Sequence, residues 1–210
     1  MSLQRIANGD FDEKIIAYLQ ECSKGDRIHT ELFVRLMHEM EMRPAYSSPW
    51  YIWQGYDTEA YIQAWIHIVT LGREYAPNIK WVWSPNRADK YTTAYYPGDE
   101  YVDYVGMSLN NTQSRYTDFK DFYEIIGTRE ALEAYNKPII LSEVAEHDFG
   151  TEKQGDYLIS VLDYVRADDN CIGVVFFNKN VTSDRKYRFT DDEVIMDRFI
   201  QIAKELLGVG

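Results

Sequence analysis

The sequence predicts an α/β fold of the (β/α)8-barrel type, the TIM barrel, in an incomplete form with about five βα units. Short apolar runs alternate along the chain with longer segments in which apolar residues recur at helical spacing. No hairpin turn of the Asn-Gly type separates the apolar runs, and this favours parallel strands. Two of the runs, Arg35–Glu39 and Lys137–Glu143, end in a glutamate. Buried parallel strands have this pattern when they carry a carboxylate to the end of a sheet.

The first half of the chain contains two expected helices and three expected strands. Apolar residues share one face in Asp10–Cys22, whose first residue is suited to cap a helix, and in Thr58–Tyr75. Short apolar runs predict strands at Glu31–Met37, Trp81–Trp83 and Tyr101–Met107.

The second half continues the alternation after a polar loop at Asn110–Ser114. Helical spacing predicts four helices, which are Phe119–Ile126, Arg129–Tyr135, Gln154–Arg166 and Asp191–Leu207. Apolar runs predict strands at Pro138–Glu143 and Gly173–Phe177. No Gly/Ser/Pro-rich linker divides the chain, so residues 1–210 are expected to form a single domain.

Composition and charge narrow the classes of partner. The net charge is −12 at pH 7, which disfavours nucleic acid and anionic lipid and is compatible with a neutral polysaccharide. No apolar run reaches transmembrane length, so no membrane partner is expected. The chain shows no signal peptide, and its localisation is left open because a longer secreted parent is compatible with the sequence.

No cofactor and no metal are expected. The sequence contains neither GxGxxG nor GxxxxGK[ST], so nucleotide binding has no support. Cys22 and Cys171 have no metal-ligand spacing and indicate no disulfide framework. His147 and Asp148 make no coordination set and are expected in a surface loop, and Glu146 is expected in solvent or behind the reacting groups.

Glu39 and Glu143 are the candidate catalytic residues. A pair of carboxyl groups at the ends of barrel strands is suited to cutting a glycosidic bond, with one group as acid/base and the other as nucleophile. The competing interpretation is that each glutamate caps a helix or neutralises a cation. Arg35 has a similar alternative, because it could simply balance a buried acid.

Six sequence pieces in order resemble glycoside hydrolase family 26, the β-mannanase and β-glucanase family among the retaining (β/α)8 glycosidases. The pieces are Arg35–Met40, Trp50–Gly55, Trp81–Asn86, Tyr95–Asp99 leading into Tyr101–Gly106, Lys137-Pro138 leading into Glu143, and Gly173–Asn178. Each piece alone is weakly specific, whereas six in the same order over nearly the whole chain are strongly so.

The resemblance implies a retaining endo-β-mannanase or endo-β-glucanase that cleaves a β-linked polysaccharide by double displacement. It places Glu39 at the end of barrel strand four as acid/base and Glu143 at the end of strand seven as nucleophile. The five expected strands then correspond to strands four to eight. Expected substrate-binding residues, also from the resemblance, are Arg35, His38, Trp50, Trp53, Trp83 and Asn110. Arg35 would support the nucleophile electrostatically, and the tryptophan rings suit the C–H face of a pyranose.

Three departures from the family pattern leave alternatives open. Glu41 stands where the family usually has an asparagine, and Asn110 stands where a tyrosine usually bonds the nucleophile. Strands one to three have no counterpart, so the barrel would have two open sheet edges. Three explanations compete: a fragment of a longer enzyme, a partner or identical copy covering the edges, or an open sheet. The alternative function is a non-catalytic carbohydrate-binding or scaffold protein derived from such an enzyme, or an inactive fragment.

Overall fold

The computed structural model describes residues 2–42, 51–55, 57–87, 92–125, 128–183 and 185–208. The chain divides into two compact units, Met1–Met107 and Ser108–Gly210. Its strands are β1 (Leu32–Arg35), β2 (Ile79–Trp83), β3 (Tyr104–Asn111), β4 (Ile139–Glu146) and β5 (Cys171–Phe176). Strand β3 begins in the first unit and ends in the second.

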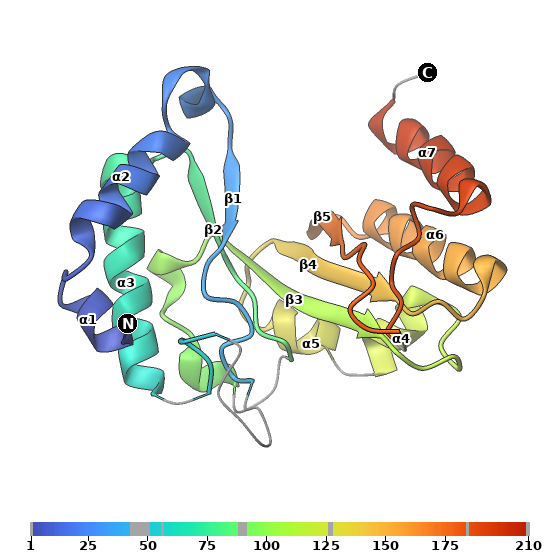
Figure 1. The fold of residues 1–210 in the computed structure, drawn as a ribbon, viewed down its shortest axis with the longest axis horizontal. Coiled ribbons are helices and arrows are strands. Elements are labelled where there is room, and N and C mark those ends of the chain that lie inside the picture. Colours follow the sequence, from blue (N-terminus) through green and yellow to red (C-terminus); the bar gives the residue numbers. More distant parts are fainter. Residues whose placement is uncertain are drawn as a thin grey trace. The chain divides into compact units, whose positions relative to one another are not determined.

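The strand order β1-β2-β3-β4-β5 follows the order in the sequence (Figure 1). The pairs β1/β2, β2/β3 and β4/β5 are all parallel. Helices separate most of the strands, and the order never reverses as it does in a doubly wound sheet. The predicted fold class, an incomplete (β/α)8-type α/β fold, is therefore confirmed.

The first unit also contains helices α1 (Leu3–Ala7), α2 (Asp12–Cys22) and α3 (Thr58–Tyr75). Helix α3 lies alongside α1 and α2, and its buried residues include Tyr61, Trp65 and Val69 (Figure 1). A glycine is required at position 72, because a Cβ atom there would lie 2.1 Å from the indole of Trp81 in β2. This close approach seats α3 against the strand that precedes the Ser84–Asn86 segment.

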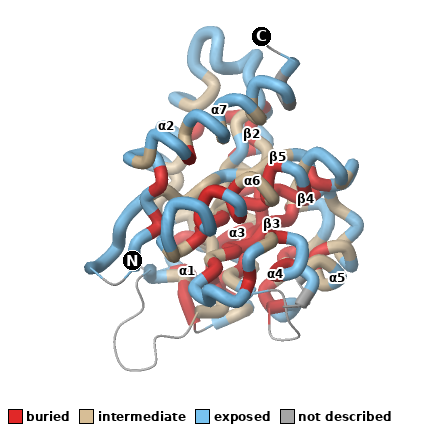
Figure 2. The backbone as a smooth tube through the Cα atoms, turned by 90° about the vertical axis from the view of Figure 1, so that its right-hand side faces the viewer, coloured by how far each residue is buried: buried red, intermediate tan, exposed pale blue. Residues whose placement is uncertain are grey.

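The second unit contains α4 (Phe119–Ile125), α5 (Thr128–Glu133), α6 (Thr151–Ala167) and α7 (Glu193–Leu207). Seven of the eight residues of β4 are buried, and α6 buries the face that includes Tyr157 and Leu158. Figure 2 shows these buried positions in red, whereas α7 is largely exposed. Helix α7 packs on α6, where Ile195 joins Leu158 and Phe189 in a small apolar cluster.

Several element boundaries differ from the sequence-based expectation. Strand β3 continues through Asn111 instead of giving way to a loop at Asn110, and β4 continues to Glu146. Glu143 therefore lies inside its strand and not at its end. The polar ends of both strands resemble loop in the sequence, but Asn111 and Glu146 are 0% and 2% exposed.

The N-terminal region also differs. Helix α1 was not expected, and Asp10 does not cap α2, which begins at Asp12 without a side-chain cap. Asp10 instead accepts a hydrogen bond from Arg5 at 2.6 Å. In the described part of the chain, no helix combines the length and the apolar character needed to cross a membrane.

Candidate functional site

Glu39 lies in a strained turn beyond the end of β1. Its φ is +54° and that of Met37 is +39°, a left-handed conformation that residues other than glycine rarely adopt. Two hydrogen bonds hold the turn. The Glu39 N–H donates to the carbonyl oxygen of Ser84 at 2.9 Å, and the Tyr61 hydroxyl donates to the carbonyl oxygen of Met37 at 3.2 Å. Strained residues of this kind persist only when the surroundings fix them, and they concentrate at functional sites.

The Glu39 side chain is held by groups from β1 and from the segment after β2. Asn86 Nδ2 donates to Glu39 Oε1 at 3.2 Å, and Arg35 Nη2 lies 3.9 Å from the same oxygen. Arg35 Nε in turn donates to the hydroxyl of Ser84 at 2.9 Å. Only 8% of Glu39 is exposed, so these contacts act on a largely desolvated carboxyl group.

The expected proximity of Arg35 and Glu39 is thus present, but for another reason. Their spacing suggested two side chains on one face of a strand, whereas β1 ends at Arg35 and the turn brings Glu39 back toward it. Ser84 and Asn86 were not among the expected site residues. Their signal was their place in the Trp81–Asn86 piece, directly after a buried strand.

Glu41 provides a second carboxyl group close to Glu39 in the sequence. Its Oε1 accepts a hydrogen bond from the backbone N–H of Arg87 at 2.6 Å. Burial is the main cause that raises the pKa of Glu41, and the charge of Glu39 acts in the same direction. Glu41 is therefore a rival proton donor that any functional test has to separate from Glu39.

An aromatic cluster lies beside the Glu39 turn. Tyr51 and Trp53 stack with ring centroids 4.6 Å apart and an interplanar angle of 3°. The Trp53 Nε1–H donates to the carbonyl oxygen of His38 at 2.8 Å, and the His38 ring lies 5.1 Å from that of Tyr51. Tyr51 is 37% exposed, so this cluster presents ring surface to solvent.

The other two expected tryptophans are placed differently. Trp83 is fully buried at the end of β2 and meets the edge of the Tyr96 ring. It packs in the interior in this structure, and contact with a sugar stays a prediction. Trp50 lies outside the described residues.

Glu143 lies in the second unit, at an irregular position of β4. Leu141 pairs with Val174 and Val144 pairs with Phe176. Between these two pairs β4 therefore contains one residue more than β5, which is a β-bulge. Such a bulge re-aims side chains and is common next to active sites. Asn110 Nδ2 on β3 donates to Glu143 Oε1 at 3.1 Å. The amide of Asn110 therefore bonds the candidate nucleophile from the position where the family has a tyrosine.

Of the two placements expected for Glu146, in solvent or behind the reacting groups, its burial excludes the first. It is 2% exposed, and burial raises its pKa to about 8, partly opposed by a hydrogen bond from the side chain of Asn111. His147 and Asp148 follow β4 in a loop, as expected. In the sequence, Glu146 looked like one more polar residue at a strand end, so its burial left no signal.

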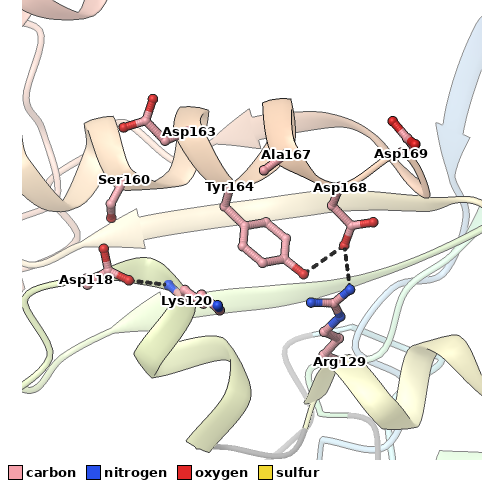
Figure 3. Close-up of a pocket in the computed structure, with 9 residues that line it drawn as sticks. All are labelled: Asp118, Lys120, Arg129, Ser160, Asp163, Tyr164, Ala167, Asp168 and Asp169. Carbon is pink, nitrogen blue, oxygen red and sulfur yellow. Dashed lines mark hydrogen bonds and ion pairs between the residues drawn. The ribbon is translucent and has the colours of Figure 1, made fainter.

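A cavity of about 430 Å³ in the second unit lies among helices and does not include Glu143 (Figure 3). Its polar groups already bond one another: Arg129 Nη2 lies 3.3 Å from Asp168 Oδ2, and the Tyr164 hydroxyl donates to that oxygen at 2.9 Å. The Arg129–Asp168 pair links α5 to the C-terminal end of α6. Across the described ranges, no group of three or more His, Cys, Asp or Glu residues is arranged to hold a metal ion.

The sequential order of the strands, all parallel where they pair, defines an α/β protein of the (β/α)8 type. The comparisons with known proteins agree. The chain belongs to glycosyl hydrolase family 26, whose family model matches residues 4–162.

Similar proteins include endoglucanase H of Acetivibrio thermocellus, which is 31% identical over 98% of this chain. The match spans only 23% of that relative's length. Among solved structures, a family 26 β-mannanase from Bacteroides ovatus is similar, with a TM-score of 0.63 and 17% sequence identity. The alignment covers 97% of this chain and 62% of the mannanase chain. An endo-β-1,4-mannanase double mutant from Cellulomonas fimi gives a TM-score of 0.64 at 16% identity, over 96% of this chain and 48% of that one. These structures support the fold.

Proposed function

We propose that the protein is a retaining β-glycoside hydrolase that cleaves β-linked mannan or glucan within the chain of the polysaccharide. The observation that carries the proposal is that each candidate carboxyl group accepts a hydrogen bond from an asparagine amide. Asn86 donates to Glu39 and Asn110 donates to Glu143. Family membership supports the same two residues, because both lie in pieces that resemble the family motifs.

The proposed mechanism has two displacements. The Glu143 carboxylate attacks the anomeric carbon while Glu39 gives its proton to the departing glycosidic oxygen, so a covalent glycosyl-enzyme forms and the reducing-end product leaves. Glu39 then takes a proton from water, and the resulting nucleophile breaks the glycosyl–Glu143 bond with net retention. A retaining pair requires its carboxyl groups about 5–5.5 Å apart.

The proposed substrate is a neutral β-linked polysaccharide. The net charge of −12 disfavours polyanions, and the exposed Tyr51–Trp53 stack offers ring surface to a pyranose. The relative at 31% identity is named an endoglucanase, and the similar structures are mannanases. Both glucan and mannan are therefore proposed, and an assay has to choose between them.

The reaction class is tested by release of reducing ends from mannan, lichenan and carboxymethyl cellulose. We expect turnover of at least one substrate by the wild type and none above background by Glu143→Ala. Affinity for a polysaccharide without turnover at any pH would instead select the non-catalytic carbohydrate-binding alternative. Equal activity of the two proteins would remove the nucleophile assignment.

A smaller effect is expected for Asn110→Ala. The variant loses one hydrogen bond to a charged carboxylate, so kcat should fall by about 10- to 100-fold while KM changes little. Asn110→Asp places a like charge beside Glu143 and should lower kcat further. Steady-state kinetics on the polysaccharide that the wild type cleaves provide the measurement. An unchanged kcat in both variants would contradict the role of Asn110.

We also propose that residues 1–210 act as one glycoside-hydrolase-like domain whose outer strands are covered by a partner or by a second copy. Large apolar residues on these strands are exposed: Phe33 of β1 by 47%, and Ile172 and Val175 of β5 by 46% and 56%. Such edges favour association. Sedimentation velocity over a range of protein concentrations should show a concentration-dependent dimer, and a monomer throughout would contradict self-association.

A further inference from the structure

Two consecutive asparagines at the end of β3 contact two glutamates of β4 within the second unit. Asn110 donates to Glu143 at 3.1 Å. The side chain of Asn111 acts on Glu146 and lowers the pKa of its carboxyl group, and the N–H of the next residue, His147, donates to the Asn111 carbonyl oxygen. Consecutive residues of a strand point to opposite faces of the sheet, so the two pairs lie on opposite sides of β3. One short stretch of backbone therefore connects the candidate nucleophile to a buried glutamate for which the proposed mechanism has no use.

Three hydrogen bonds hold Asn111, the neighbour of Asn110, in one position. Its Oδ1 accepts a hydrogen bond from the Gln113 N–H at 3.0 Å, and its Nδ2 donates to the Tyr116 carbonyl oxygen at 3.0 Å. The His147 N–H donates to the Asn111 carbonyl oxygen, also at 3.0 Å. A change at Glu146 would thus act on the residue next to Asn110.

The surroundings of Glu146 favour its protonated form. Its Oε2 is buried and makes no hydrogen bond to the described residues, and the raised pKa of about 8 leaves the group mostly neutral at pH 7. From α6, Gln154 donates to the Glu146 backbone oxygen at 3.0 Å. Burial, the charge of Glu146 and that of Asp118 before α4 all raise the pKa of Tyr157, so its hydroxyl stays protonated. His147 and Asp148 follow Glu146 directly in the loop.

We propose that the buried Glu146 is a positioning residue for Glu143, which it aligns through Asn111 and the neighbouring amide of Asn110. The inference rests on the proposed function, because it concerns the proposed nucleophile. A buried carboxylate without a cation beside it is costly. When Glu146 loses its proton, the ends of β3 and β4 have to open to water, and the Asn110 amide leaves its place on Glu143.

The first test is the pH dependence of kcat/KM with a 2,4-dinitrophenyl β-glycoside. This leaving group needs no proton from Glu39, so the alkaline limb reports other groups. The wild type should lose about tenfold in kcat/KM between pH 7 and about pH 9, as one group with a pKa near 8 ionises. Glu146→Gln keeps the shape of the protonated acid and should retain its activity over this range.

Glu152→Gln is the matched control, because Glu152 is exposed in the first turn of α6 of the same unit. Its alkaline limb should match that of the wild type. An alkaline limb in Glu146→Gln that is the same as in the wild type would overturn the proposal. Thermal unfolding of each variant shows whether it is folded. Between about pH 5 and pH 9 the melting temperature of Glu146→Gln should fall less than that of the wild type. In the wild type, the carboxyl group has a higher pKa in the folded than in the unfolded state, so the free energy of unfolding decreases as the pH rises between the two values. The glutamine does not titrate and lacks this effect.

A second readout needs no turnover and separates this inference from the proposed function. In ¹H–¹⁵N spectra of the wild type, the side-chain amide signals of both Asn110 and Asn111 should move with a midpoint near pH 8, and in Glu146→Gln neither should. Asn110→Ser and Asn111→Ser assign the two signals. If both signals move in a protein that cleaves no glycoside, the hydrolase proposal fails while the coupling holds. If the Asn110 signal does not move in the wild type, the positioning role is wrong.

Discussion

Replacing Glu143 with alanine is expected to lower kcat on the natural polysaccharide by about 10⁴-fold or more, equivalent to about 5 kcal/mol of transition-state stabilisation. The variant removes the proposed nucleophile, so no glycosyl-enzyme can form and the first displacement has no protein partner. KM should change little, because the side chain acts on the anomeric centre and not along the length of the polysaccharide. Initial rates of reducing-end release provide the measurement.

Rescue by azide tests whether the group lost in Glu143→Ala is the nucleophile. In Glu143→Ala the cavity left by the carboxylate admits azide, which should attack an activated β-glycoside directly and give the α-glycosyl azide. Glu152→Ala, a substitution of an exposed glutamate in the same unit, should retain full activity and give no azide product. A Glu143→Ala protein that is folded and loses less than about tenfold would contradict the assignment, because loss of a nucleophile costs far more.

The fold could largely be predicted because hydrophobic periodicity reports burial. Helix α3 matches its predicted range, Thr58–Tyr75, at both ends, since its apolar face lies against β2 and Asp57 caps it through the Ala60 N–H. The ends of β3 and β4 could not be predicted. Their last residues, Asn111 and Glu146, are polar and yet buried, and the burial of Asn111 depends on hydrogen bonds to Gln113 and Tyr116 that only the fold brings about.

The sequence predicted which residues belong to the candidate site better than it predicted how they are placed. The spacing of Arg35 and Glu39 pointed to a contact, but the left-handed turn that produces it depends on the Ser84 carbonyl oxygen, far along the chain. Asn110 was expected near Glu143 from the family pattern, and its amide does bond that carboxylate. The partners that sequence reasoning missed, Ser84 and Asn86, are neutral residues whose role depends on tertiary contacts.

Replacing Glu39 with glutamine should lower kcat on polysaccharide by about 10²- to 10⁴-fold, the usual contribution of a general acid. The amide keeps the shape of the side chain and can still meet Asn86, but it has no proton to give to the departing sugar oxygen. With a 2,4-dinitrophenyl glycoside the leaving group departs unaided, so the first displacement should proceed at nearly the wild-type rate. The second should stall, because no base activates water. Rapid-quench measurements should then show a burst of dinitrophenol followed by slow turnover.

Azide and the neighbouring glutamate decide whether Glu39 is the acid/base. In Glu39→Ala, azide should attack the accumulated glycosyl-enzyme and give the β-glycosyl azide, the opposite anomer from that expected in Glu143→Ala. Glu41→Gln is the matched control, because Glu41 has a raised pKa and stands only two residues away. Its Oε1 can still accept the hydrogen bond from the Arg87 N–H after the change, so activity should fall by at most about threefold. If Glu41→Gln instead shows the burst and Glu39→Gln does not, the proton donor is Glu41. The strained turn at Glu39 would then serve only to place Arg35 and Asn86.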